Sequence, residues 1–454
     1  MSGAPPIPPA PGRDRAAGGP PPPVPGDEGR YAYDVARSDP RGPGSLGEGP
    51  AAPARARRPW VRRAAWIGGF ALLALIAAGV SVYVAVKIGP GTALVAFTTA
   101  LVPVAIVLAA VWWLDRYTPQ PRSTLLFAFG WGAAMSVALA LVIGTVVELT
   151  LIGEDTEADV AQFLGAVVQA PIVEESMKSA GLLVLLLFGR RYISGPLDGV
   201  VYAVLIAGGF AFTENILYFG QAFAQSQAAG ETSAFWQTFL MRGLMSPFAH
   251  AGFTSLAGLG IGIAAERRSL PLYIGLGIGG LSLGMCLHAL WNGATFFIDV
   301  DPEEPLRGFL TYYAIVQIPI FLILAAIMAW LRWRERTIVR RQLSAYGRAG
   351  WFTPDEVTMM LSMRSRRRAE AWAARHGANA RTAMRDLIRA AVQLAMDRNS
   401  ARHARRRTER IRRDERDLLE RITSDRRLID ALTRPVARPA PAGAPTDTPE
   451  RVAS

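Results

Sequence analysis

Long apolar segments alternate with short polar connections between Ala64 and Leu331. Each segment is long enough to cross a bilayer as a helix, because a span needs about 20 predominantly apolar residues. The segments cover residues 64–86, 91–114, 123–147, 161–188, 197–220, 238–264, 271–297 and 309–331. The pattern therefore predicts an all-α, polytopic membrane protein with about eight transmembrane helices.

The two ends of the chain are polar and differ in composition from the apolar middle. Residues 1–58 are rich in Pro, Gly and Ala and cannot bury a core, so they are predicted to form a disordered cytoplasmic tail. Residues 336–432 combine apolar residues at helical spacing with many Arg, which predicts a basic helical cytoplasmic region containing an N-cap at Thr353. Residues 433–454 are predicted to be a second disordered tail, which leaves 59–335 as the transmembrane domain.

Basic connections between the spans alternate with acidic or neutral ones. The basic set is "DRYTPQPR", "GRRYISGP" and "AERRSLP", together with the residues before the first span and after the last. By the positive-inside rule these segments lie in the cytoplasm. The sequence therefore predicts a multi-pass protein of the cell membrane with both termini cytoplasmic.

The net charge of +12 comes from the tails and from these connections. Arg runs such as "RSRRR" and "RHARRR" suit anionic lipid headgroups, and a solvated helical face explains them equally well. No nucleic-acid recognition motif accompanies the runs, so nucleic acid is not an expected partner. The single cysteine, Cys286, excludes an intramolecular disulfide.

Ionisable and amide side chains inside the spans concentrate in four consecutive segments. A charge at this depth is costly unless it is paired, so such residues are functional candidates by default. The set consists of Glu174, Glu175, Lys178, Glu214, Asn215, His250, His288 and Asn292, with Arg242 near the outer end of its span. Helical spacing places Glu174 and Lys178 on one face, where the lysine is expected to neutralise a glutamate. Asn215 is a candidate for interhelical hydrogen bonding, and Trp291 is a candidate wall of the pocket.

Such a set permits hydrolysis by two routes, both of which the sequence leaves open. In the first, Glu174 or Glu175 deprotonates a water molecule, and an Asn and a His donate to the developing oxyanion. In the second, His250, His288 and Glu175 hold Zn²⁺, whose bound water is the nucleophile. The alternatives are an ion- or proton-coupled membrane transporter that uses the Glu and His side chains as a relay, and a catalytically inactive scaffold.

Four motifs follow one another on four successive spans: "EESMK", "FAFTEN", "HAGFT" and "HALWN". The segment "DRYTPQP" follows the second span. In this order the motifs resemble the PrsW family of intramembrane proteases, which belongs to a broader group containing CAAX prenyl endopeptidases and bacteriocin-processing enzymes. The resemblance covers about residues 64–335.

The resemblance implies a glutamate-dependent or metal-dependent endopeptidase that cuts a membrane-protein substrate, in the family's best-known role a transmembrane anti-sigma factor. It implies Glu174 and Glu175 as the catalytic pair, with His250 and His288 as metal ligands or oxyanion donors. It also implies that Glu214 and Asn292 complete the site. Zn²⁺ is the expected cofactor if a metal is used, and the related CAAX enzymes leave a metal-free mechanism open.

Overall fold

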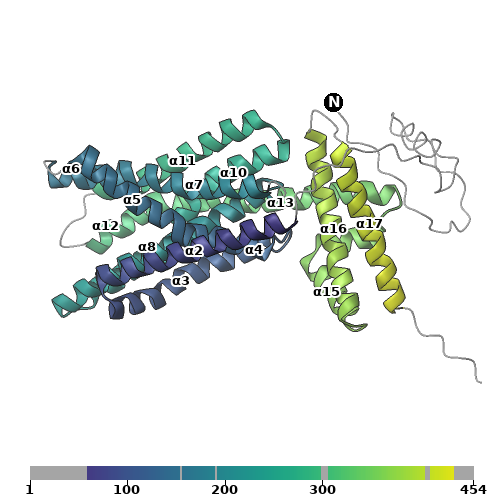
Figure 1. The fold of residues 1–454 in the computed structure, drawn as a ribbon, viewed down its shortest axis with the longest axis horizontal. Coiled ribbons are helices and arrows are strands. Elements are labelled where there is room, and N and C mark those ends of the chain that lie inside the picture. The colour runs from purple at the N-terminus through teal and green to yellow at the C-terminus, as the bar shows by residue number, and fades with distance from the viewer. Residues whose placement is uncertain (1–58, 154–155, 190–191, 298–304, 404–408, 434–454) are drawn as a thin grey trace, which may run out of the picture.

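The computed structural model describes residues 59–153, 156–189, 192–297, 305–403 and 409–433, and nearly all of these residues are helical (Figure 1). No strand occurs in this part of the chain. The predicted tail 1–58 and all but the first residue of 433–454 lie outside it. The all-α prediction is therefore confirmed for the described residues.

Seven helical segments within these residues are long and apolar enough to cross a membrane. Their elements are α2 (Pro59–Ile88), α3 (Pro90–Asp115), α4 (Arg122–Gly130), η1 (Trp131–Ser136), α5 (Val137–Val147), η2 (Glu148–Ile152), α8 (Pro196–Ala229), α9 (Ser233–Thr238), η5 (Phe239–Met245), α10 (Ala249–Arg267), α11 (Leu270–Phe297), α12 (Pro305–Tyr312), η6 (Tyr313–Gln317) and α13 (Ile318–Arg348). The elements labelled η are π-helical turns. The multi-pass membrane architecture is thus confirmed.

The eighth predicted span, 161–188, is also helical but is not among the seven. It consists of α6 (Ala158–Phe163), η3 (Leu164–Gln169) and α7 (Ala170–Gly189). α7 packs against α5, α8, α10 and α11 with one face and exposes the other. Its three charged residues make it more polar than a simple apolar span, so length and hydropathy alone do not identify it.

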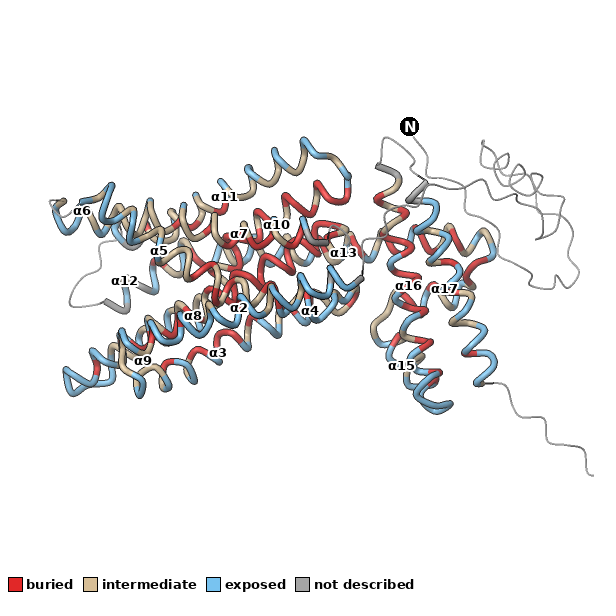
Figure 2. Tube along the Cα trace, in the orientation of Figure 1, coloured by how far each residue is buried: buried red, intermediate tan, exposed pale blue. Residues whose placement is uncertain are grey.

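α8 and α10 form the buried centre of the membrane domain (Figure 2). Every residue of α8 from Pro196 to Phe210 is buried. The two helices approach closely where Gly199 faces Gly258, because a Cβ on either residue would overlap the carbonyl oxygen of the other. Small residues at such crossings let helix backbones pack at short range within a membrane.

The basic connections meet at one end of the helices. Asp198 accepts hydrogen bonds from the backbone N–H of Ser194 and from Nε2 of Gln120, both at 2.8 Å. Arg334, just beyond the last span, forms a 2.8 Å ion pair with Glu266. The connections after α3, α7 and α10 therefore lie where α13 leaves the membrane helices. The opposite end, which carries α6, α9 and α12, is called the distal end below (Figure 2).

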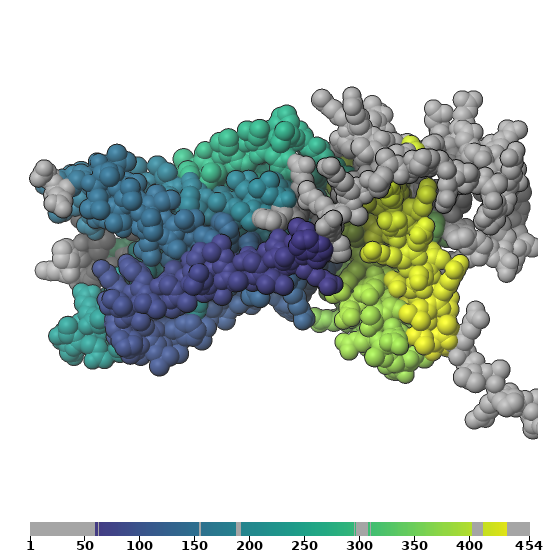
Figure 3. Space-filling view, viewed as in Figure 1, coloured from purple at the N-terminus to yellow at the C-terminus, as the bar shows by residue number. Residues whose placement is uncertain are grey.

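The C-terminal helices form a second core beside the membrane helices (Figures 1 and 3). α13 runs without interruption past the predicted boundary at residue 335 and contributes Val339, Leu343 and Tyr346 to this core. The other members are α14 (Pro354–Leu361), α15 (Met363–Ala374), α16 (Ala378–His403) and α17 (Glu409–Thr433). One long helix thus belongs to both parts of the protein.

The start of α14 has the capping interaction predicted from the sequence. Thr353 Oγ1 accepts from the backbone N–H of Glu356 at 3.2 Å, and the Glu356 carboxylate accepts from the backbone N–H of Thr353 at 2.7 Å. This capping box satisfies two backbone donors that the first helical turn leaves free. The predicted N-cap at Thr353 is therefore confirmed.

Arg366 joins the C-terminal helices to the connection after α3. Its Nη1 donates to the carbonyl oxygen of Tyr117 at 2.7 Å, and its Nε donates to that of Met360 at 2.8 Å. The guanidinium group also lies 4.1 Å from the centre of the Tyr117 ring. One arginine of the run at 364–368 is therefore buried in a contact within the protein, whereas its neighbours are exposed: Arg364, Arg367 and Arg368. The side chains of "RHARRR" lie outside the described residues.

Candidate active site

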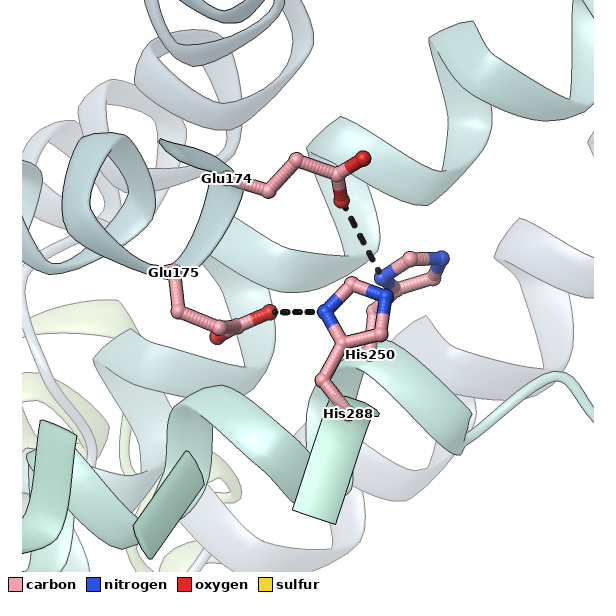
Figure 4. A group of neighbouring side chains, drawn as sticks. All are labelled: Glu174, Glu175, His250 and His288. Carbon is pink, nitrogen blue, oxygen red and sulfur yellow. Dashed lines mark hydrogen bonds and ion pairs between the residues drawn. The ribbon is translucent and has the colours of Figure 1, made fainter. Parts of the chain in front are cut away.

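Polar side chains from four helices converge in the membrane domain (Figure 4). α7 supplies two glutamates and a lysine, α8 a glutamate, and α10 and α11 one histidine each: Glu174, Glu175, Lys178, Glu214, His250 and His288. Each of these side chains lies within 4.0 Å of at least one other member of the set. The structure thus brings together most of the residues predicted to be catalytic.

Glu175 lies on the buried side of the cluster and uses both of its oxygens. Oε1 accepts from Lys178 Nζ at 2.8 Å and lies 3.2 Å from Nδ1 of His288, while Oε2 accepts from Thr254 Oγ1 at 2.7 Å. Because a carboxylate only accepts, Nδ1 of His288 carries a hydrogen. Glu175, whose side chain is 1% exposed, therefore fixes the orientation of the His288 ring and the hydrogen on its Nδ1.

Glu174 faces the accessible side of the cluster. Its Oε2 accepts from Lys178 Nζ at 3.1 Å and lies 3.9 Å from Nδ1 of His250. Its side chain is 14% exposed. The two adjacent glutamates therefore occupy different environments, as expected from the turn of about 100° between neighbouring residues of a helix.

Glu214 holds His250 from the other side. Its Oε2 lies 2.8 Å from Nε2 of His250 and 2.7 Å from Nη2 of Arg242. Nε2 of His250 therefore donates to Glu214, and its Nδ1 accepts from Lys178 Nζ at 3.0 Å. Nε of Arg242 donates to Oδ1 of Asn215 at 3.3 Å, so this amide bonds to the neighbouring span.

The α-helix is interrupted directly before His250. η5 ends at Met245 and α10 begins at Ala249, so the predicted span 238–264 is not one continuous α-helix. Pro247 lies in the interruption, where it removes a backbone donor and disfavours helical geometry in the residue before it. The interruption places His250 in the first turn of α10. Breaks and π-helical turns of this kind often occur at functional sites in membrane proteins.

Asn292 and Trp291 lie beside the cluster. Nδ2 of Asn292 donates to the carbonyl oxygen of Ala166 at 2.8 Å and so ties α11 to η3. Trp291 packs edge-on against Phe253 at 5.7 Å between ring centres, and Phe253 stacks on His288 at 4.7 Å. Asn292 therefore has a helix-tying contact, and Trp291 reaches the histidine only through a second ring.

Thr254, Arg242 and Phe210 belong to the site although the sequence analysis gave them no role. Thr254 and Phe210 lie one helical turn from His250 and Glu214, so helical spacing contained a signal for both. The Phe210 ring centre lies 4.0 Å from the ammonium nitrogen of the buried lysine. Arg242 lies on η5, and α-helical spacing does not predict where a side chain on a π-helical turn points.

The donor set fits Zn²⁺. The ligand atoms of Glu174, Glu175, His250 and His288 all lie within 4.8 Å of one another. A tetrahedral site with bonds of about 2.0–2.1 Å would bring such atoms to about 3.4 Å apart, which requires only a modest contraction. The ammonium group of Lys178 already lies 2.8–3.1 Å from three of these four residues. A metal ion at these donors therefore requires Lys178 to leave its present position.

A cleft of about 330 Å³ leads from Glu174 and Glu214 toward the distal end. Its walls come from α2, α5, η3, the first turns of α7 and the middle of α8. The other lining residues are Tyr83, Lys87, Val137, Ala140, Leu141, Gly144, Gln169, Ala170, Val173, Phe210, Leu217, Tyr218 and Gln221. Glu175 and His288, at 1% and 3% exposure, lie deeper than the cleft lining. Glu174 and Glu214 are thus the carboxylates that a molecule in the cleft meets first.

Comparison with known proteins finds a matching family model and a curated relative. Residues 120–324 match the model of the PrsW family of intramembrane metalloproteases. The Protease PrsW of Clostridioides difficile (strain 630) is 30% identical over 122 residues, which are 27% of this chain and 49% of that protein. The chain thus spans about half the length of this curated relative. No solved structure matches the present chain.

Proposed function

We propose, from the premise that residues 120–324 belong to the PrsW family, that this protein is an intramembrane endopeptidase acting on a membrane-protein substrate. The observation that carries the proposal is the position of Glu174 and Glu214. They lie at the inner end of a cleft and next to two histidines, of which His250 is half-buried and His288 is buried. A group of carboxylates and imidazoles at the end of a cleft suits general acid–base hydrolysis.

We assign water activation to Glu174 because it is the partly exposed member of the glutamate pair. Its carboxylate takes a proton from water as the water oxygen bonds to the scissile carbonyl carbon. The proton then passes to the leaving amine nitrogen as the carbon–nitrogen bond breaks, which returns Glu174 to its ionised form. Glu175, with both oxygens occupied by hydrogen-bond donors, instead positions Lys178 and His288.

The two cations of the site balance most of its negative charge. Lys178 contacts Glu174 and Glu175, and Arg242 contacts Glu214. Negative charge that develops on the carbonyl oxygen during attack is stabilised by such fixed cations, and more strongly in a dry site than in water. When bound by the four candidate ligands, Zn²⁺ would supply a Lewis acid and a more acidic water.

The proposal extends to substrate, topology and lipid contacts. The end of the bundle that carries the C-terminal helices is proposed to face the cytoplasm, because the basic connections meet there. The substrate is proposed to be a transmembrane regulator, such as an anti-sigma factor, that enters from the bilayer. The exposed arginines of α15 are proposed to contact anionic lipid headgroups on the same side: Arg364, Arg367 and Arg368.

Quantitative proteomics of membrane-protein fragments tests the activity. Cells expressing the wild type are compared with cells expressing Glu174→Gln, and Glu148→Gln, at an exposed glutamate of η2, is the matched control. A substrate should be cut in the wild type and the control and stay full length with Glu174→Gln. Identical fragment profiles in all three strains would contradict the proposed function.

A further inference from the structure

The cleft next to Glu174 is narrow. It extends along α8 from Phe210 to Gln221, which corresponds to about 16 Å of helix axis. The empty space of about 940 Å³, which includes open solvent, gives over that length a mean cross-section of at most about 60 Å². A helix about 10 Å in diameter has a cross-section of about 80 Å². The cleft therefore excludes an intact helix and admits an extended segment of about four or five residues at about 3.3 Å per residue.

The lining of the cleft suits an unwound backbone. Unpaired N–H and C=O groups are costly in a membrane, so an extended segment needs hydrogen-bonding partners there. Polar side chains provide them along the walls: Tyr83, Gln169, Tyr218 and Gln221. Lipid tails are purely apolar and form no hydrogen bonds, so this lining does not favour them as the occupant.

The distal mouth of the cleft carries one cation, Lys87. It lies in the last turn of α2 and is exposed, and no ion pair is found for it among the described residues. It contrasts with Lys178 and Arg242, which are already paired with the carboxylates at the inner end. The sequence contains only two lysines. Lys87 lines this cleft, and Lys178 is paired with Glu174 at its inner end.

We infer that Lys87 is a specificity-determining residue, which pairs with an acidic side chain of the substrate on the distal side of the scissile bond. The inference rests on the proposed function. The occupant is then an extended stretch of a single-span membrane protein that has an Asp or Glu a few residues from the cut. An amine-bearing flexible side chain suits this position because it can follow an acidic group at several depths.

Photocrosslinking in nanodiscs of zwitterionic lipid tests the inference without requiring cleavage. The full-length protein carries p-benzoylphenylalanine in place of Leu141, which lines the cleft. The probes are three Leu/Ala-rich single-span peptides that differ only in having Asp, Asn or Lys in the distal quarter. We expect roughly threefold to tenfold more crosslinking to the Asp peptide, in line with one partly screened ion pair.

The matched control moves the same charge away from the cleft. Lys87→Val combined with Val86→Lys keeps the composition and depth of α2 and points the amine about 100° around the helix. We expect this double variant to crosslink the Asp and Asn peptides equally, and Lys87→Glu to prefer the Lys peptide. A preference for the Asp peptide that survives the swap would show that the amine at position 87 does not set it. A wild type without preference or without crosslinks would also overturn the inference.

Cleavage of the same peptides separates this inference from the proposed function. A charge-dependent crosslink without any cleavage supports the role of Lys87 and contradicts the peptidase. Equal cleavage of the Asp and Asn peptides supports the peptidase and contradicts the role of Lys87.

Discussion

The ammonium nitrogen of Lys178 lies 3.0 Å from Nδ1 of His250, on the opposite side of the imidazole ring from Glu214. The ring is therefore held at both nitrogens, by a donor and by an acceptor. Lys178 occupies the position from which a metal ion would contact the ring and both glutamates of α7. The lysine and a metal ion are thus competitors for the same donors.

Lys178→Met should change stability and metal affinity in opposite directions. Removing one partner of a buried ion pair costs about 3–5 kcal/mol, so the melting temperature without metal should fall. Zn²⁺ should raise that temperature more for the variant than for the wild type, because no ammonium group competes with it. Thermal unfolding of the purified protein with and without Zn²⁺ measures both effects. An equal or smaller Zn²⁺ effect in the variant would contradict the competition.

Glu174→Gln and Glu175→Gln should separate catalysis from stability. Glu174→Gln should abolish cleavage and leave the melting temperature within a few degrees of the wild type, because the lost group is partly exposed. Glu175→Gln should lower stability by about 2–4 kcal/mol, because its amide presents a donor toward groups that already donate. Unfolding scans of both variants beside a cleavage assay check this. Equal stability of the two variants would remove the distinction between the glutamates.

Thr254→Val should weaken the anchoring of Glu175. The hydroxyl donates to a buried carboxylate at 2.7 Å, and leaving that oxygen without its donor costs about 1–3 kcal/mol. Thr254→Ser keeps the donor and is the matched control. Melting temperatures of the two variants should differ by several degrees, with Thr254→Ser closer to the wild type. A valine variant as stable as the serine variant would argue against the anchor.

Arg366→Ala should loosen the connection after α3. The side chain donates one hydrogen bond to the carbonyl oxygen of Tyr117 and one to that of Met360, and it lies over the Tyr117 ring. Without these contacts the backbone around residues 116–121 should exchange amide hydrogens faster. Arg367→Ala, at an exposed neighbour, should leave the exchange unchanged. Hydrogen–deuterium exchange with mass spectrometry reads out this segment directly. Unchanged exchange in Arg366→Ala would show that the contact does not hold the connection.

Asp397 should make the C-terminal helices less stable as pH rises. Burial raises the pKa of this carboxyl from 3.8 to about 6. The folded state therefore binds the proton more tightly than the unfolded chain. The loss of folding stability caused by ionising this carboxyl is absent below about pH 4 and complete above about pH 6. Asp397→Asn should remove this dependence and add about 1–2 kcal/mol at neutral pH. Unfolding between pH 4.5 and 7.5 tests it, with exposed Asp417→Asn as a control expected to behave like the wild type.

The convergence of the four helices was predictable because buried charges need partners. Glu174, Glu175, Glu214, His250 and His288 could satisfy one another only by facing a common point. The different surroundings of the adjacent glutamates also followed from helical geometry. These inferences needed only the spacing of polar residues within apolar segments.

The details that escaped prediction depend on tertiary structure. A proline within an apolar segment is compatible with a kinked continuous helix, so Pro247 alone did not indicate the interruption before His250. The partner of Arg242 depends on the π-helical turn that carries it. The extent of α13 could not be read from hydropathy, because its apolar pattern ends where the polar continuation of the same helix begins.

α13 connects the interruption before His250 to the C-terminal helices. At its N-cap, Gln317 accepts a hydrogen bond at 2.9 Å from Ser246, within the interruption that precedes His250. At its other end, Tyr346 is enclosed by the C-terminal helices. The 31 residues between Ile318 and Arg348 form one helix about 46 Å long. Because no break divides this helix, a displacement of the C-terminal helices along its axis would move its N-cap contact with the segment that carries His250.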